Sequence, residues 1–294
     1  MGHQHQHDKG SGQIKVAFFL NLGFTILEII GGLLTNSVAI LSDALHDLGD
    51  SFSLGMAWFL ERFSNRKADE KFSYGYRRFS LLAALINTVV LILGSAFILT
   101  EAIPRLFAPE HSNAQGMILF AIGGIAVNGF AAFRLNQGSS LSSKVVMWHL
   151  LEDVLGWTAV LIVGIVLMFK DIHVLDPLLS ILVTIYVLYN VVKNLKKTLI
   201  LFLQGVPDSV SIQALEKKFS AFDGVTSVHH THVWSLDGEH HVLTTHLVVA
   251  QDVDRNQILS IKKLVAAATE DLHLEHSTIE IEYENEFCSM NGGD

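Results

Sequence analysis

The sequence predicts a membrane-embedded bundle of six α-helices followed by a small α+β domain. Hydrophobic residues make up 50% of the 294 positions and charged residues only 17%, whereas soluble domains carry about 25% charged residues. Six apolar stretches each approach the length of about 20 residues that a helix needs to cross a bilayer. The charge is also divided: residues 1–204 carry 14 acidic and 15 basic side chains, and residues 205–294 carry 15 acidic and 5 basic ones, a net −10.

The six apolar stretches define the membrane part of the chain. They cover residues 14–34, 38–60, 79–103, 115–135, 145–169 and 175–195. Lipid offers the backbone no hydrogen-bonding partner, so each stretch should be a helix. We therefore expect three parts: a His-rich tail at 1–13, a transmembrane domain at 14–204 and a soluble domain at 205–294.

The basic residues of the loops predict the orientation of the spans. Six lie between the second and third spans, at Arg62, Arg66, Lys67, Lys71, Arg77 and Arg78. The loops that would face the other side carry only Arg105 and Lys170. Since Lys and Arg accumulate in cytoplasmic loops, we expect a multi-pass protein of the cell membrane with both termini in the cytoplasm.

The soluble part alternates between helical and strand patterns. Asp208 would cap a helix over 209–222, and Asp254 a second helix reaching 272. Between them, strands at 224–236 and 240–250 flank the turn signal Asp237-Gly238, and a last strand covers 278–284. This order, α-β-β-α-β, predicts a two-layer, ferredoxin-like domain, and its acidity argues against nucleic acid as a partner.

Two of the spans carry matched pairs of metal-ligand side chains. His46 and Asp50 lie four residues apart in the second span, and His149 and Asp153 repeat the spacing in the fifth, so each pair shares one helical face. Two such helices facing each other would form a four-ligand cage suited to a tetrahedral ion such as zinc. The alternative is two intrahelical pairs that only hold helices together.

The other ionisable residues in the spans have more open roles. Asp43 could orient His46 from outside the cage or be purely structural, and Asp47 is similarly ambiguous. Glu28 and Glu101 could be helix-packing groups, and we assign them no role.

The sequence argues against an enzyme. The zinc-protease pattern His-Glu-x-x-His is absent, and four protein ligands would leave no open position for a catalytic water. The single cysteine, Cys288, excludes a disulfide framework and a zinc ribbon. We assign no catalytic residue and no organic cofactor.

The chain resembles the cation diffusion facilitator family, in particular its bacterial-type, zinc-exporting branch. The resemblance rests on SDALHDLGD at 42–50, HLLED at 149–153, FSYGYRR at 72–78 and VHHTHVW at 228–234. It implies a homodimer in the bacterial inner membrane that exports zinc from the cytoplasm in exchange for protons. It also implies that His46, where other members have aspartate, favours zinc over cadmium.

Two other functions stay open at this point. One is a membrane-anchored metal sensor, and the other is an exporter chiefly of cobalt, nickel, cadmium or iron, because one N/O site binds several of these metals. Proton exchange follows from ligand chemistry in either exporter. Metal ligands must be deprotonated, so binding the metal expels protons and protonation expels the metal.

The resemblance also implies a regulatory metal site in the soluble domain, which would sense zinc and support dimerisation. Its ligands would be His229, His246 and Glu282, and Glu280 and His232 are additional candidates. Alternate strand residues share a face, so Glu280 joins Glu282, whereas His232 would lie opposite His229 unless the strand is bulged. The alternative is a solvated, His-rich sheet edge.

Three further features receive no site. The resemblance would place a third metal site in the connector at Asp69, but the family's histidine positions there are Lys71 or Phe72, and Tyr76. The segment from His3 to His7 could capture metal, be the remnant of a purification tag, or be plain coil. Cys288 could be a ligand, or more simply a bystander thiol.

Overall fold

The computed structural model describes residues 7–64, 68–136, 141–288 and 290, and these form two compact units. The first unit falls within Met1–Arg62 and Ala83–Leu195, and the second within Phe63–Leu82 and Lys196–Asp294. The second unit thus includes the connector that joins the second and third long helices. His3 and His5 of the N-terminal tail lie outside the described residues.

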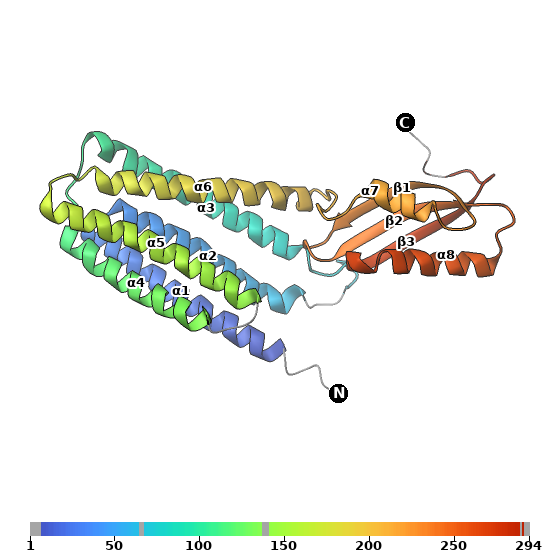
Figure 1. Cartoon of the computed structure of the whole chain (residues 1–294), viewed down its shortest axis with the longest axis horizontal. Coiled ribbons are helices and arrows are strands. Elements are labelled where there is room, and N and C mark those ends of the chain that lie inside the picture. Colours follow the sequence, from blue (N-terminus) through green and yellow to red (C-terminus); the bar gives the residue numbers. More distant parts are fainter. Residues whose placement is uncertain (1–6, 65–67, 137–140, 289, 291–294) are drawn as a thin grey trace. The chain divides into compact units, whose positions relative to one another are not determined.

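Each predicted span is a helix, which confirms the six-helix membrane part (Figure 1). The helices are α1 (His7–Thr35), α2 (Val38–Ser64), α3 (Phe79–Phe107), α4 (Ala114–Asn136), α5 (Leu141–Phe169) and α6 (Leu175–Phe202). Within the described part of the chain, every one of them except α2 is long and apolar enough by itself to count as a span. The length of α2 is comparable, but Asp43, Asp47 and Asp50 make it too polar.

The polar helix α2 is held by contacts with α1, α3 and α6. The Asn21 side chain of α1 donates to the Asp47 carbonyl (3.1 Å) and to the Ser51 hydroxyl (3.0 Å). On the α6 side, the hydroxyls of Ser42 and Thr184 lie 2.9 Å apart. Buried Val38 packs with α3 side chains. Charged groups within a membrane span usually face the interior of the bundle, and Asp47, which is 5% exposed, does so here.

Helices α4 and α5 pack closely because one glycine leaves room for a large aromatic ring. Trp157 of α5 is 1% exposed and belongs to the main apolar cluster of the bundle. A Cβ atom at Gly124 of α4 would overlap the Trp157 indole. The close packing fixes α5, which carries the second pair of metal-ligand residues.

The C-terminal part has the predicted element order. It consists of α7 (Ile212–Phe219), β1 (Val225–Ser235), β2 (His241–Val249), α8 (Arg255–Ala268), a 3-10 turn η1 (Glu270–Leu272) and β3 (Leu274–Tyr283). The sheet order is β1-β2-β3, with β2 antiparallel to β1 and parallel to β3. Buried side chains of both helices pack with β1 and β2, which leaves the other sheet face to the histidines.

Several predicted element boundaries in this domain were wrong, among them the end of α8, which is Ala268 rather than 272. The cap of α7 is Ser211, whose hydroxyl accepts from the Ala214 amide (3.3 Å), because Asp208 falls in the turn before it. Strand β3 begins at Leu274 rather than 278, since it pairs with β2 from His241 onward. The predicted cap of α8 is confirmed: Asp254 and Gln257 form a reciprocal capping box.

Candidate metal centres

The two His–Asp pairs of the spans meet inside the first unit. We call His46, Asp50, His149 and Asp153 the intramembrane cluster. Asp50 Oδ2 lies 2.9 Å from His149 Nε2 and 3.7 Å from His46 Nε2, so one carboxylate touches both imidazoles. The two imidazole centroids are 5.8 Å apart. Ligand atoms of His46, Asp50 and His149 all lie within 4.8 Å of one another.

Asp153 stands slightly apart from these three residues. Its Oδ2 lies 4.0 Å from His149 Nε2, and it is not among the three whose ligand atoms are closest together. The structure therefore brings three of the four predicted residues into one compact group, with the fourth at its edge. A tetrahedral zinc site spaces its ligand atoms by about 3.3 Å, so the Asp153 carboxylate would have to move closer to His149 to join the set.

A cavity of about 280 Å³ adjoins the cluster between α2, α5 and α6. Asp43, His46, Glu152 and Asp153 line it together with Tyr186 and other α6 side chains. Gly156 faces Asp43 across this space, where a Cβ would come within 3.5 Å of the Asp43 carboxylate. At about 30 Å³ per water molecule, the cavity can hold an ion with several waters.

Glu28 of α1 is a buried carboxylate to which we assigned no role from the sequence. It is 1% exposed and near enough to Asp47, Asp43 and Asp153 for their charges to interact. The signal was present in the sequence, because an ionisable residue inside a span is expensive and usually functional. Glu101, by contrast, forms an ion pair with Arg105 (2.6 Å) near the end of α3.

A second group of metal-ligand side chains lies on the sheet face that α7 and α8 leave uncovered. We call His229, His246, Glu282 and Cys288 the sheet cluster; their ligand atoms lie within 4.8 Å of one another. Glu282 contacts His246 Nδ1 (2.7 Å) and His229 Nε2 (3.2 Å). Glu280 reaches the other nitrogen of His246 (3.3 Å).

The charge state of Glu282 suits a metal ligand. Burial would raise the pKa of its carboxyl, but hydrogen bonds from Cys288 and His246 and the nearby imidazoles lower that pKa below its ordinary value. The carboxylate is therefore ionised at neutral pH. His246, Glu282 and Cys288 are each less than a tenth exposed, so a bound ion would be largely shielded from water.

A β-bulge changes the expected placement of His232. In the antiparallel pairing of β1 with β2, His229 lies opposite His246 and His232 lies opposite Thr244. Strand β1 therefore has one extra residue between these two pairs. His230, in the bulge, has a positive φ of 49°. His229 and His232 consequently share a face, and the prediction of opposite faces holds only for an unbulged strand. His232 is nevertheless outside the compact group.

Cys288 is a candidate metal ligand, although the sequence alone favoured a thiol without a role in metal binding. A turn after β3, in which the Glu286 amide donates to the Tyr283 carbonyl (2.7 Å), carries the chain back toward the sheet. This brings the Cys288 sulfur to 3.7 Å from His246 Nδ1. A thiolate is a good ligand for zinc. The sequence offered no spacing motif that would have joined Cys288 to His246.

In the connector, Asp69 binds backbone rather than histidines. Its carboxylate accepts from the amides of Lys71 (2.9 Å) and Phe72 (2.8 Å) and from the Tyr76 hydroxyl (2.6 Å).

We predict that Asp69→Ala leaves zinc affinity and flux within about twofold of wild type, or about 0.4 kcal/mol. Zinc titration and vesicle flux would check this; a loss as large as that from a cluster substitution would contradict it.

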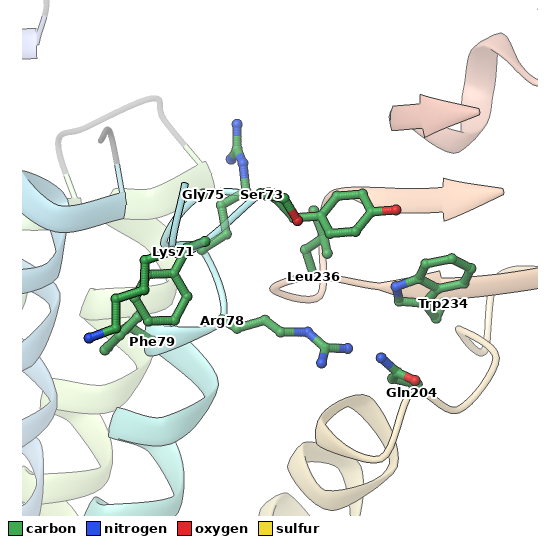
Figure 2. Close-up of a pocket in the computed structure, with 11 residues that line it drawn as sticks. Lys71, Ser73, Gly75, Arg78, Phe79, Gln204, Trp234 and Leu236 are labelled. Atoms are coloured by element: carbon green, nitrogen blue, oxygen red, sulfur yellow. The ribbon is translucent and has the colours of Figure 1, made fainter. Parts of the chain in front are cut away.

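The connector also lines a cavity of about 290 Å³ within the second unit (Figure 2). Arg78 extends across it toward Trp234 and Gln204. None of the described lining residues is His, Cys, Asp or Glu, and we assign it no metal. Nearby, Arg77 pairs with Asp237 (3.5 Å) and Glu275 (3.3 Å), so connector cations neutralise part of the acidic domain.

These features define a multi-pass membrane protein whose helices enclose a cluster of metal ligands. Comparison with known families agrees: the cation efflux transmembrane domain matches residues 14–203, and the cytoplasmic domain of cation efflux proteins matches 207–284. The chain belongs to the cation efflux family, which confirms the resemblance to cation diffusion facilitators.

Curated relatives are similar over nearly their whole length. The zinc transporter ZitB of Pectobacterium atrosepticum is 33% identical over 99% of this chain and 93% of its own. A cadmium, cobalt and zinc/H(+)-K(+) antiporter of Bacillus subtilis is 32% identical, covering 97% and 93%. ZitB of Escherichia coli is 31% identical, covering 100% and 97%.

Proposed function

We propose that this protein exports zinc from the cytoplasm in exchange for protons, with His46, Asp50, His149 and Asp153 as the transport ligands. The observation that carries the proposal is the contact of one carboxylate, that of Asp50, with two imidazoles from different helices. Family membership supports transport rather than catalysis. The relatives named above are zinc transporters or an antiporter of cadmium, cobalt and zinc.

Proton coupling follows from the ligand set. Imidazole and carboxylate can each hold either a proton or a metal ion, and both cannot occupy the same lone pair. Zinc entering from the cytoplasm would displace protons, and protons arriving from a more acidic exterior would displace zinc. The cavity beside His46 and Asp153 supplies space for ions and water to reach the ligands.

We further propose a homodimer with both termini in the cytoplasm and a regulatory zinc site at the sheet cluster. The basic connector between α2 and α3 supports the orientation, and the match to a cytoplasmic domain supports the side of residues 205–294. The domain's net charge of −10 would repel a second copy. Divalent metal at the sheet cluster would reduce that repulsion.

Flux through a vesicle membrane tests the proposed function. The full-length protein is reconstituted in liposomes, a pH gradient is imposed, and zinc movement is followed with a zinc-sensitive dye. We expect zinc to move against the proton flow and to stop when a protonophore removes the gradient. Zinc binding without gradient-driven movement would favour a membrane-anchored sensor instead.

Metal selectivity gives a further prediction. His46→Asp replaces a borderline nitrogen ligand with a hard oxygen that tolerates larger ions and higher coordination numbers. We expect the cadmium-to-zinc flux ratio to rise by roughly threefold or more, about 0.7 kcal/mol. Parallel flux assays with the two metals measure it, and His46→Ala, which should lose both metals, is the control. An unchanged ratio would exclude His46 as the selectivity ligand.

A further inference from the structure

A third group of metal-ligand side chains lies where two loops of the first unit meet. His111 comes from the α3–α4 loop, and Asp171 and His173 come from the α5–α6 loop; we call them the loop cluster. His173 Nε2 lies 2.6 Å from Asp171 Oδ1 and 2.7 Å from His111 Nδ1. His111 Nδ1 is 3.9 Å from the same Asp171 oxygen.

The nitrogen His173 Nε2 lies within hydrogen-bonding distance of two potential acceptors at once. The backbone amide of Ser112 donates to His173 Nδ1 (3.4 Å), so in the neutral ring Nε2 carries the hydrogen. That single hydrogen faces two acceptors, Asp171 Oδ1 and His111 Nδ1. A divalent cation in its place would accept a lone pair from all three atoms, which no single proton can do well.

The donor set indicates the kind of cation. Two imidazole nitrogens and one carboxylate oxygen suit zinc and similar transition metals, whereas calcium and magnesium prefer oxygen ligands throughout. Tetrahedral zinc would hold its ligand atoms about 3.3 Å apart, so the loop cluster must open slightly. The exposed side chains can do this, because His111 is 81% and Asp171 79% exposed, while His173 is 14% exposed and anchored.

The anchored ligand lies next to a rigid part of the bundle. Ser112, which donates to His173, also donates through its hydroxyl to Asp176 (3.4 Å). Asp176 is fully buried at the start of α6. Its carboxylate accepts from the Val38 amide (2.9 Å) and the Ser37 hydroxyl (2.5 Å) at the N-terminus of α2. His173 is therefore positioned by the helix that carries His46 and Asp50.

We propose that His111, Asp171 and His173 bind a zinc-type divalent cation at the face where exported metal leaves the protein. The side of the membrane is taken from the proposed function, in which the basic connector is cytoplasmic. The α3–α4 and α5–α6 loops lie at the opposite ends of the helices from this connector, so they face the exterior. Three protein ligands leave the fourth position to water. This site is open and exchanges its ion readily, unlike a closed structural site.

Counting bound zinc tests the site. Full-length protein in detergent is equilibrated with Zn²⁺ alone near neutral pH, and bound zinc per chain is measured for wild type and His111→Ala/His173→Ala. We expect the double variant to bind one ion fewer. Glu110→Gln, which removes a carboxylate from the same loop but outside the loop cluster, should bind as wild type. Equal zinc in all three proteins would overturn the proposal.

Chemical footprinting of the wild type gives an answer that does not depend on the folding of a variant. Histidine acylation is read by mass spectrometry on the tryptic peptide 106–134, whose one histidine is His111. Zinc added outside proteoliposomes should reduce the labelling of His111 at least threefold in those molecules whose loop cluster faces the outside of the vesicle. Unchanged labelling at saturating zinc would refute the site. Protection without gradient-driven flux would support this site while rejecting the proposed export.

Discussion

Asp50→Ala should abolish pH-gradient-driven zinc flux, lowering it by roughly a hundredfold or more, which corresponds to about 2.7 kcal/mol. Asp50 is the residue whose oxygen contacts both His46 and His149, at 3.7 and 2.9 Å. Its removal takes away the negative charge between two imidazoles and one exchangeable proton. Asp153→Ala should also abolish flux, although its carboxylate lies at the edge of the intramembrane cluster. Flux in proteoliposomes of matched protein content measures both.

Matched substitutions separate this effect from helix damage. Ser53 is an exposed residue of α2, less than one turn beyond Asp50, and its hydroxyl accepts a hydrogen bond from the Asn87 side chain (2.7 Å). The Ser53→Ala protein should transport zinc normally. Leu155→Ala changes an exposed residue of α5, two positions from Asp153, that is not among the residues lining the cavity, and serves as the control for Asp153. Near-normal flux in both Asp50→Ala and Asp153→Ala, with protein that elutes as wild type, would reject the intramembrane cluster as the transport site.

His246→Ala should remove the zinc response of the C-terminal domain. His246 contacts Glu280 and Glu282 through its two nitrogens and lies beside Cys288. A ligand whose free concentration is a hundred times its dissociation constant stabilises the folded state that binds it by about 2.7 kcal/mol. In wild type, saturating zinc should therefore slow amide hydrogen exchange in β2 by roughly a hundredfold where exchange requires unfolding of the domain, and in the variant it should not.

The full-length protein is suited to this measurement because hydrogen exchange reports on β2 separately from the helices. Cys288→Ser tests the thiol that the sequence did not connect to the site, and should reduce the zinc effect. His276→Ala is the matched control: an exposed histidine of β3 outside the sheet cluster. If zinc protects β2 equally in wild type and His246→Ala, the sheet cluster is not a regulatory metal site.

The sequence by itself determined the features that depend on local periodicity. Six apolar stretches of membrane length became six helices, because lipid leaves the backbone no other way to satisfy its hydrogen bonds. The alternation of Glu280 and Ile281 placed the acid toward His246 and the isoleucine toward the core. The four-residue spacing of His46 and Asp50 placed both on one face of α2, since that spacing is close to one helical turn.

Only the tertiary structure decided which distant groups meet. Asp50 touches His149, 99 positions away, more closely than Asp153 does, because helix packing sets that distance. The bulge at His230 reversed the face of His232. Chain reversals brought Cys288 to His246, and His111 to His173. Such contacts depend on loops, bulges and interhelical packing, whose energies arise from residues far apart in the chain and leave no periodic pattern in it.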